Sequence, residues 1–132
     1  MPAPGATGYA FNCTRQVYLA TRLSVARTHW TRFWGLMGEN SLSFDAGRGL
    51  WIVPSHGVHT LGMKFPIDVV YLDQERQVLH LEMNLPPWRV APVRARARSV
   101  LELPSGTLRS TGTSVGDEIE IVEGQTREDA PV

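Results

Sequence analysis

The stretch SHGVHTLGMKFPIDVV, residues 55–70, holds the residue types from which a metal or catalytic site could be built. His56 and His59 lie three positions apart, and Asp68 follows them at the start of an apolar run. Histidine and carboxylate side chains supply zinc ligands or an acid–base pair. Two glycines and a proline argue against a helix here, so the histidines would meet only in a tight turn. The pair alone is a weak signal, and the sequence predicts neither a metal nor another cofactor.

Asp68 is the more informative residue of this stretch. It is isolated among Ile and Val residues, so we expect it to be at least partly buried. A buried carboxylate without partners costs on the order of several kcal/mol, so it must be hydrogen-bonded, paired or open to a wet cleft. We expect Asp68 to accept hydrogen bonds from the 59–66 loop, with His59 nearby and His56 pointing elsewhere. The alternative is a cleft carboxylate that acts with His59 as acid and base, although no nucleophile completes that constellation.

These considerations predict a ligand-binding groove near residues 58–68, with no assigned catalytic residue. Its candidate lining joins residues of the loop to two residues of an aromatic segment that precedes it. The candidates are His59, Thr60, Gly62, Met63, Asp68, Trp34 and Met37.

The aromatic segment is predicted to be the single helix, at about residues 25–36. Its apolar residues approximate the 3.6-residue period of a helix with one buried face. Trp30, Phe33 and Trp34 cannot share one narrow stripe, so at least one of them should lie at a rim or line a groove.

Short runs of β-branched and aromatic residues between turn formers predict five or six strands. A short polar linker joins residues 67–73 to residues 77–84, which predicts an antiparallel hairpin. Residues 105–117 are expected to form a loop or a short helical turn. The other candidate strands are residues 16–21, 49–54 and 118–123, with the apolar end of 95–104. The predicted fold class is mainly β, a compact β-sandwich or barrel-like domain of short antiparallel strands with one short α-helix.

Length and composition indicate one soluble globular domain. The chain has 132 residues, 42% of them hydrophobic and 20% charged, which suits a single core. We expect a single β-rich domain at residues 13–123, with flexible tails at residues 1–12 and 124–132. No apolar run approaches the roughly 20 residues that span a bilayer. A single cysteine and no recognisable export signal favour the cytoplasm.

Arg89, Arg94, Arg96 and Arg98 form the only basic cluster of the sequence. Such a cluster can bind phosphate or an acidic partner, or it can be a solvated face matched by the acidic residues of the 117–123 segment. The chain has 13 basic and 13 acidic residues, so it lacks the net charge that nucleic-acid binding usually needs. We therefore favour the solvated face and expect no nucleic-acid partner.

Several motifs, in their order and spacing, resemble the bacterial and archaeal family called domain of unknown function one-nine-two. These motifs are GLM at 35–37, VHTLGMKFPIDVVYLD at 58–73, VLELPSG at 100–106 and GD at 116–117. The resemblance covers about residues 16–122 and implies a small, mainly β domain, with no established activity, substrate or cofactor. The site positions that it implies are His59, Thr60, Gly62, Met63, Asp68, Leu36, Met37 and Glu102. The family commonly has a glycine in the hairpin near the position of Arg76. A left-handed backbone there would cost a non-glycine residue about 1 kcal/mol, and the alternative is a turn of another type.

The sequence thus predicts a non-enzymatic accessory module that binds an unknown small molecule or protein. The alternative is a hydrolase-type enzyme that uses Asp68 and His59, with or without the assistance of a metal. The missing nucleophile or third metal ligand favours the binding module.

Overall fold

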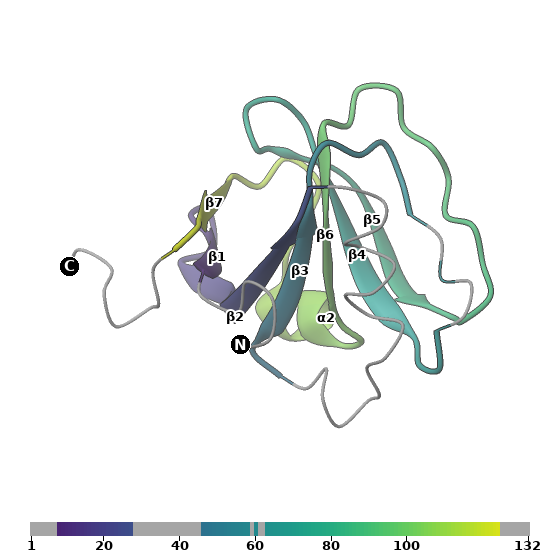
Figure 1. Ribbon diagram of the computed structural model, residues 1–132. Coiled ribbons are helices and arrows are strands. Elements are labelled where there is room, and N and C mark those ends of the chain that lie inside the picture. The colour runs from purple at the N-terminus through teal and green to yellow at the C-terminus, as the bar shows by residue number, and fades with distance from the viewer. Residues whose placement is uncertain (1–7, 28–45, 59, 61–62, 125–132) are drawn as a thin grey trace.

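The computed structural model describes residues 8–27, 46–58, 60 and 63–124, and it confirms the mainly β fold (Figure 1). The strands, in chain order, are β1 (Gly8–Asn12), β2 (Val17–Ala26), β3 (Arg48–Ile52), β4 (Ile67–Leu72), β5 (Val78–Leu85), β6 (Ser99–Pro104) and β7 (Ile119–Val122). A short helix, α2 (Thr107–Thr111), follows β6. No helix among these residues is long and apolar enough to cross a membrane.

The strands form one sheet in the order β5-β4-β6-β3-β2-β1-β7. An isolated bridge between Gln77 and Glu118 brings the β5 end of the sheet to the segment before β7. The sheet therefore curls into a half-barrel (Figure 1). All neighbours pair antiparallel except β2 and β3, which are parallel. The expectation of antiparallel strands alone is wrong for that pair, because the chain between β2 and β3 is long enough for a crossover.

The predicted hairpin is confirmed, since β4 and β5 pair antiparallel. Two other expectations are wrong. The strand expected at 16–21 continues to Ala26, so residues 25–26 extend a strand that pairs with β3 and do not begin a helix. Residues 8–12, assigned to a tail, form β1 because their apolar side chains are covered when the strand pairs with β2 and β7. The rest of the expected helix, residues 28–36, lies outside the described residues.

Alternating side chains of β4 pack into two separate clusters, one on each face of the sheet. Ile67, Val69 and Tyr71 belong to an outer cluster, which the loops before β4 and after β5 cover. Val70 and Leu72 belong to an inner cluster, which fills the curl with residues from all seven strands and from α2. Each such side chain contributes roughly 1.5–3 kcal/mol by burial. A strand that is buried on both faces is apolar on both, which explains why Asp68 is its only charged residue.

The hairpin between β4 and β5 has Arg76 at φ 65°, in the left-handed region. A non-glycine residue there costs roughly 1 kcal/mol. The Arg76 guanidinium lies over the Trp51 ring, 4.5 Å from its centroid. A cation–π contact of about 0.5–2 kcal/mol offsets the cost, so this chain tolerates arginine at a left-handed position.

Candidate functional site

Asp68 is buried, as expected, but its hydrogen bonds come from other segments than the one predicted. Its side chain is 1% exposed. Oδ1 accepts from the Asn84 backbone N–H at 2.8 Å, and Oδ2 accepts from the N–H groups of Gly106 at 3.1 Å and Leu108 at 2.9 Å. None of these donors belongs to residues 60 and 63–66, the described part of the loop from which they were expected, because Met63 and Phe65 pack in the outer cluster whereas Asp68 points to the inside of the curl.

These three bonds hold an irregular corner of the fold together. The β4–β5 register shifts between Ile67 and Val69, which leaves an extra residue on β5 opposite Asp68. Asn84 lies in that bulge at φ 55°, and its side-chain oxygen accepts a hydrogen bond from Ser105. Gly106, at φ 97°, caps the start of α2. The Asp68 carboxylate thus ties the bulge of β5 to the turn before α2, and both of its oxygens are engaged by the protein itself.

Thr60 and Met63 are also buried, in the loop before β4. The Thr60 hydroxyl lies 2.7 Å from the Pro86 carbonyl oxygen, to which it donates, and it accepts from the Arg89 backbone N–H at 2.8 Å. The Thr60 backbone also pairs with Trp88 and Arg89. Met63 packs in the outer cluster. Thr60 therefore fastens the segment that follows β5 to the loop that precedes β4.

The remaining groove candidates, His59, Gly62, Trp34 and Met37, lie outside the described residues, as do Trp30 and Phe33. Their assignment to a groove stays a prediction. Glu102, which the family resemblance also marks, lies fully buried on β6 between Leu50 of β3 and Val69 of β4.

Residues 56–58 and 60 lie beside the 88–94 segment, to which backbone hydrogen bonds join them. Ala91 donates to Val58 and Arg94 donates to His56, each at 2.9 Å. The His56 ring donates from Nδ1 to the Ala97 carbonyl oxygen at 2.7 Å. His56 therefore points away from Asp68, as expected, and supports the far end of the same segment.

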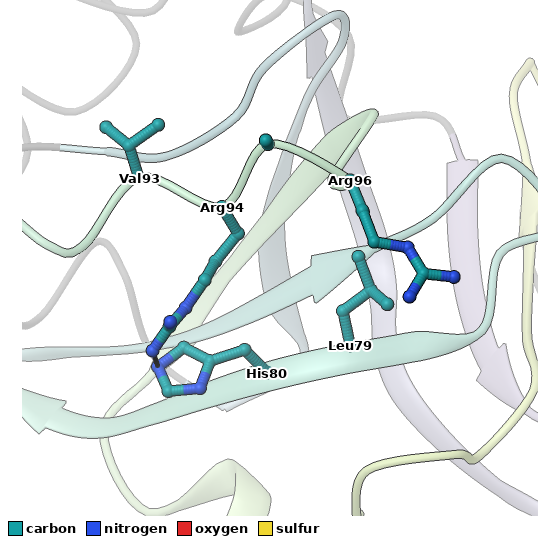
Figure 2. A pocket seen from close by; sticks show the side chains of 6 residues that line it. Leu79, His80, Val93, Arg94 and Arg96 are labelled. Atoms are coloured by element: carbon teal, nitrogen blue, oxygen red, sulfur yellow. Dashed lines mark hydrogen bonds between the residues drawn. The ribbon is translucent and has the colours of Figure 1, made fainter.

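A pocket of about 450 Å³ opens between this segment and β5. It is lined by Leu79, His80, Val93, Arg94, Ala95 and Arg96. Figure 2 shows the Arg94 side chain running from the segment toward His80, with the Arg96 guanidinium beside Leu79. The lining therefore combines an apolar patch with three basic side chains.

A β-bulge brings the β5 side of the pocket into place. Tyr71 pairs with His80 and Leu72 with Val78, so Leu79 is the extra residue of the bulge. Bulges re-aim side chains and are common beside functional sites. In a regular strand Leu79 and His80 would point to opposite faces, whereas here both line one pocket.

Tyr71 fixes the segment above the pocket. Its hydroxyl donates to the Pro92 carbonyl oxygen at 2.7 Å, and its ring meets the His80 ring edge-on at 5.1 Å. Burial, and then the nearby Glu82 carboxylate, raise the pKa of Tyr71 to about 12. The hydroxyl therefore stays a donor to Pro92 through the physiological range.

The charges of the pocket are predominantly positive. His80 Nε2 lies 2.5 Å from a Glu82 carboxylate oxygen and 3.5 Å from Arg94 Nη2. Arg94 and Arg96 are exposed, and neither forms an ion pair with an acidic residue in the part of the chain that the structure describes. A guanidinium fork with free donors matches the geometry of a carboxylate or a phosphate.

Sequence reasoning identified these arginines as a cluster but interpreted them as a solvated face. The signal that favours a site is tertiary: the bulge at Leu79 and the bond from Tyr71 to Pro92. Neither is visible in the local pattern. Metal chemistry has no comparable support in the described ranges, where no three His, Cys, Asp or Glu side chains are grouped as metal ligands.

A third buried carboxylate, Asp117, lies just before β7. It accepts bonds from the Asn12 side chain at 2.9 Å, from Arg15 Nε at 3.0 Å and from the Ser114 backbone N–H at 3.0 Å. Burial alone would raise its pKa, but the bonds from Arg15, Asn12 and Ser114 outweigh burial and hold the pKa below its usual value. Like Asp68, Asp117 has a structural role.

Two solved structures resemble this fold. A protein of unknown function from Novosphingobium aromaticivorans superposes with a TM-score of 0.70 at 21% identity, covering 86% of this chain and 82% of that one. A putative transcription regulator from Sinorhizobium meliloti superposes with a TM-score of 0.68 at 20% identity, covering 86% and 91% of the two chains. At such low identity the likeness shows the fold alone.

Sequence comparison identifies the family. A UPF0127 protein of Thermococcus sibiricus is 30% identical over 128 residues, covering 92% of this chain and 80% of that protein. A UPF0127 protein of Pyrococcus abyssi is 29% identical over 119 residues, covering 86% and 97%. The sequence model of the DUF192 family, described as Uncharacterized ACR, matches residues 11–121. With most of its length matched, and with the fold expected from the resemblance, this chain belongs to the uncharacterised DUF192 family.

Proposed function

We propose that this protein is a non-enzymatic binding module whose ligand carries a carboxylate or phosphate group. The observation that carries the proposal is the pocket between β5 and residues 93–96, where Arg94, Arg96 and His80 surround an apolar wall formed by Leu79 (Figure 2). A concave site with an apolar wall and a few convergent polar groups is typical of ligand binding.

The chemistry of the lining defines the ligand class. Each charge-assisted hydrogen bond contributes about 1.5–3 kcal/mol, so two arginine contacts give on the order of 4 kcal/mol. Because association also costs translational and rotational freedom, a Kd of about 1 mM is the tightest expected for a small anion. A larger ligand gains further from contact with Leu79 and with the exposed side chain of Val93.

Two observations favour a binding module over the hydrolase alternative. The Asp68 carboxylate is 1% exposed and accepts three backbone hydrogen bonds, which leaves it far from any substrate. Burial, followed by repulsion from Glu120 and Glu118, raises the pKa of Cys13. A thiol with a raised pKa is a poor nucleophile at neutral pH.

Hydrogen bonds from His56 and Thr60 support one side of this pocket. Thr60 and His56 hold the ends of the segment that carries Arg94 and Arg96. The predicted groove with His59, Gly62, Trp34 and Met37 remains a second candidate for the same kind of ligand.

The proposal is tested by titrating the ¹⁵N-labelled protein with N-acetyl-L-glutamate and with inorganic phosphate. We expect saturable amide shifts at the pocket residues with a Kd in the millimolar range. The double variant Arg94→Gln/Arg96→Gln should bind at least about tenfold more weakly. Arg109→Gln, an exposed arginine on α2, removes a like charge elsewhere and should bind as the parent does. Equal binding by parent and double variant, or no response up to about 20 mM of either probe, would contradict the proposal.

A further inference from the structure

We infer that the ligand of this pocket is an acidic, partly apolar segment of a protein partner, which binds in extended form along residues 88–96. This inference rests on the proposed function, since an acidic side chain of the segment would occupy the pocket. It adds the identity of the ligand and a second contact surface.

The second surface is a row of exposed apolar side chains beside the pocket. Trp88, Val90 and Val93 are 65%, 70% and 71% exposed. Single apolar residues on a surface are ordinary. Three large ones within six consecutive positions make a patch of the kind that marks a protein contact.

The protein holds this row rigidly in an outward orientation. Trp88 has φ 63°, a left-handed conformation that costs a non-glycine residue roughly 1–2 kcal/mol. The Trp88 backbone N–H donates to the Thr60 carbonyl oxygen at 2.9 Å, and the bonds of the Thr60 hydroxyl secure the neighbouring residues. Ala91, between the exposed residues, is buried and bonded to Val58. A surface that is ordered beforehand loses less conformational entropy on binding.

The charge of the same segment selects an acidic partner. Residues 86–98 contain Arg89, Arg94, Arg96 and Arg98 and no Asp or Glu, although the whole chain has 13 residues of each sign. All four arginines are exposed. Complementary charge steers association and excludes basic partners.

The shape of the surface favours an extended peptide over other anionic partners. Residues 88–94 span at most about 20 Å, the length of roughly six residues of an extended chain. The pocket at one end is concave and can take a side chain, whereas a bilayer surface cannot enter it. Nucleic acid usually needs several stacking aromatics, and Trp88 is the one aromatic side chain that is exposed in the described part of the chain.

The test compares an acetylated, amidated hexapeptide of alternating glutamate and leucine with N-acetyl-L-glutamate, by isothermal titration. We expect the peptide to bind at least about tenfold more tightly, because it adds apolar contacts to the pocket contact. Trp88→Ser/Val90→Ser should abolish this gain and leave the Kd of N-acetyl-L-glutamate unchanged. Val115→Ser, which removes an equally exposed valine elsewhere, should retain the gain. A hexapeptide of alternating lysine and leucine should not bind.

The outcomes separate this inference from the proposed function. If the acidic peptide binds no more tightly than N-acetyl-L-glutamate, or if the gain survives Trp88→Ser/Val90→Ser, the inference fails while the anion pocket stands. If neither probe binds, both fail. The protein is also sedimented with vesicles of phosphatidylcholine and phosphatidylglycerol at 3:1. If it binds these vesicles, and the acidic peptide binds no more tightly than N-acetyl-L-glutamate, the partner of this surface is a bilayer and the inference is wrong. Circular dichroism confirms that each variant is folded.

Discussion

Asp68 lies on β4, is 1% exposed and accepts three backbone hydrogen bonds. Arg94 and Arg96 lie exposed over β5, and their guanidinium groups border a pocket that the protein leaves open. Both oxygens of Asp68 accept hydrogen bonds from within the fold, whereas Arg94 and Arg96 retain hydrogen-bond donors for a ligand. The difference separates stability from binding: changes at the buried carboxylates should affect unfolding, and changes at the exposed arginines should affect recognition.

The largest effect is expected at Asp68. Asp68→Asn preserves the shape but turns an amide NH₂ group toward at least one backbone N–H, so the free energy of unfolding should fall by about 2–5 kcal/mol. Thermal unfolding should show a Tm lower by roughly 10 °C. Glu75→Gln, at an exposed carboxylate in the hairpin, is the matched control and should change stability by less than about 0.5 kcal/mol. If the two variants have a similar Tm, the hydrogen bonds of Asp68 do not stabilise the fold.

A smaller, pH-dependent effect is expected at Asp117. Because its pKa is lowered in the folded state, the unfolded chain binds more protons, and its contribution is present above the unfolded pKa of about 3.9. The contribution of Asp117 to the free energy of unfolding is therefore lost as the pH falls through its pKa in the folded state. Asp117→Asn should lower stability by about 1–3 kcal/mol at pH 7 and by less in acid. Urea unfolding at pH 7 and near pH 3 measures the free energy of unfolding of the parent and of the variant. If the difference between them is the same at the two pH values, the prediction is wrong.

Thr60 links the two regions, and its effect should be smaller again. Thr60→Val keeps the volume but leaves the Arg89 backbone N–H without its acceptor, which should cost about 1–2 kcal/mol. Thr60→Ser keeps the hydroxyl and should recover most of that loss. Urea unfolding of both variants checks the difference, and equal losses would show that the Thr60 hydroxyl does not secure the segment.

The smallest change in stability is expected at the pocket itself. Arg94→Gln/Arg96→Gln alters exposed side chains that form no ion pair with an acidic residue among the described residues, so the free energy of unfolding should stay within about 0.5 kcal/mol of the parent. A loss above about 2 kcal/mol would mean that the arginines are structural.

Local pattern predicted much of the fold. The polar linker between two apolar runs predicted the β4–β5 hairpin, and the isolation of Asp68 among Ile and Val residues predicted its burial. The donors to Asp68 could not be predicted in the same way. They belong to Asn84, Gly106 and Leu108, which are 16 to 40 residues further along the chain. Such partners depend on how the strands are arranged, and local periodicity carries no information about that arrangement.

The pocket, too, could not be predicted from the local sequence. The spacing of the arginines marked them as a cluster, but whether they face solvent or a pocket depends on two tertiary features. One is the register shift that brings Leu79 and His80 to the same side. The other is the bond from Tyr71 to Pro92, which holds the segment over β5. Both join positions that are too far apart for a short sequence motif.

Arg94 and Arg96 are thus assigned to ligand binding, and the buried Asp68 and Asp117 to stability. The most direct measurement is a ¹⁵N-detected titration with N-acetyl-L-glutamate of the parent and of Arg94→Gln/Arg96→Gln, with unfolding measured on the same samples. We predict amide shifts centred on Leu79, His80 and residues 93–96 in the parent, and their loss in a variant of unchanged stability. Shifts centred elsewhere, or shifts that persist in the variant with the same Kd, would contradict the account.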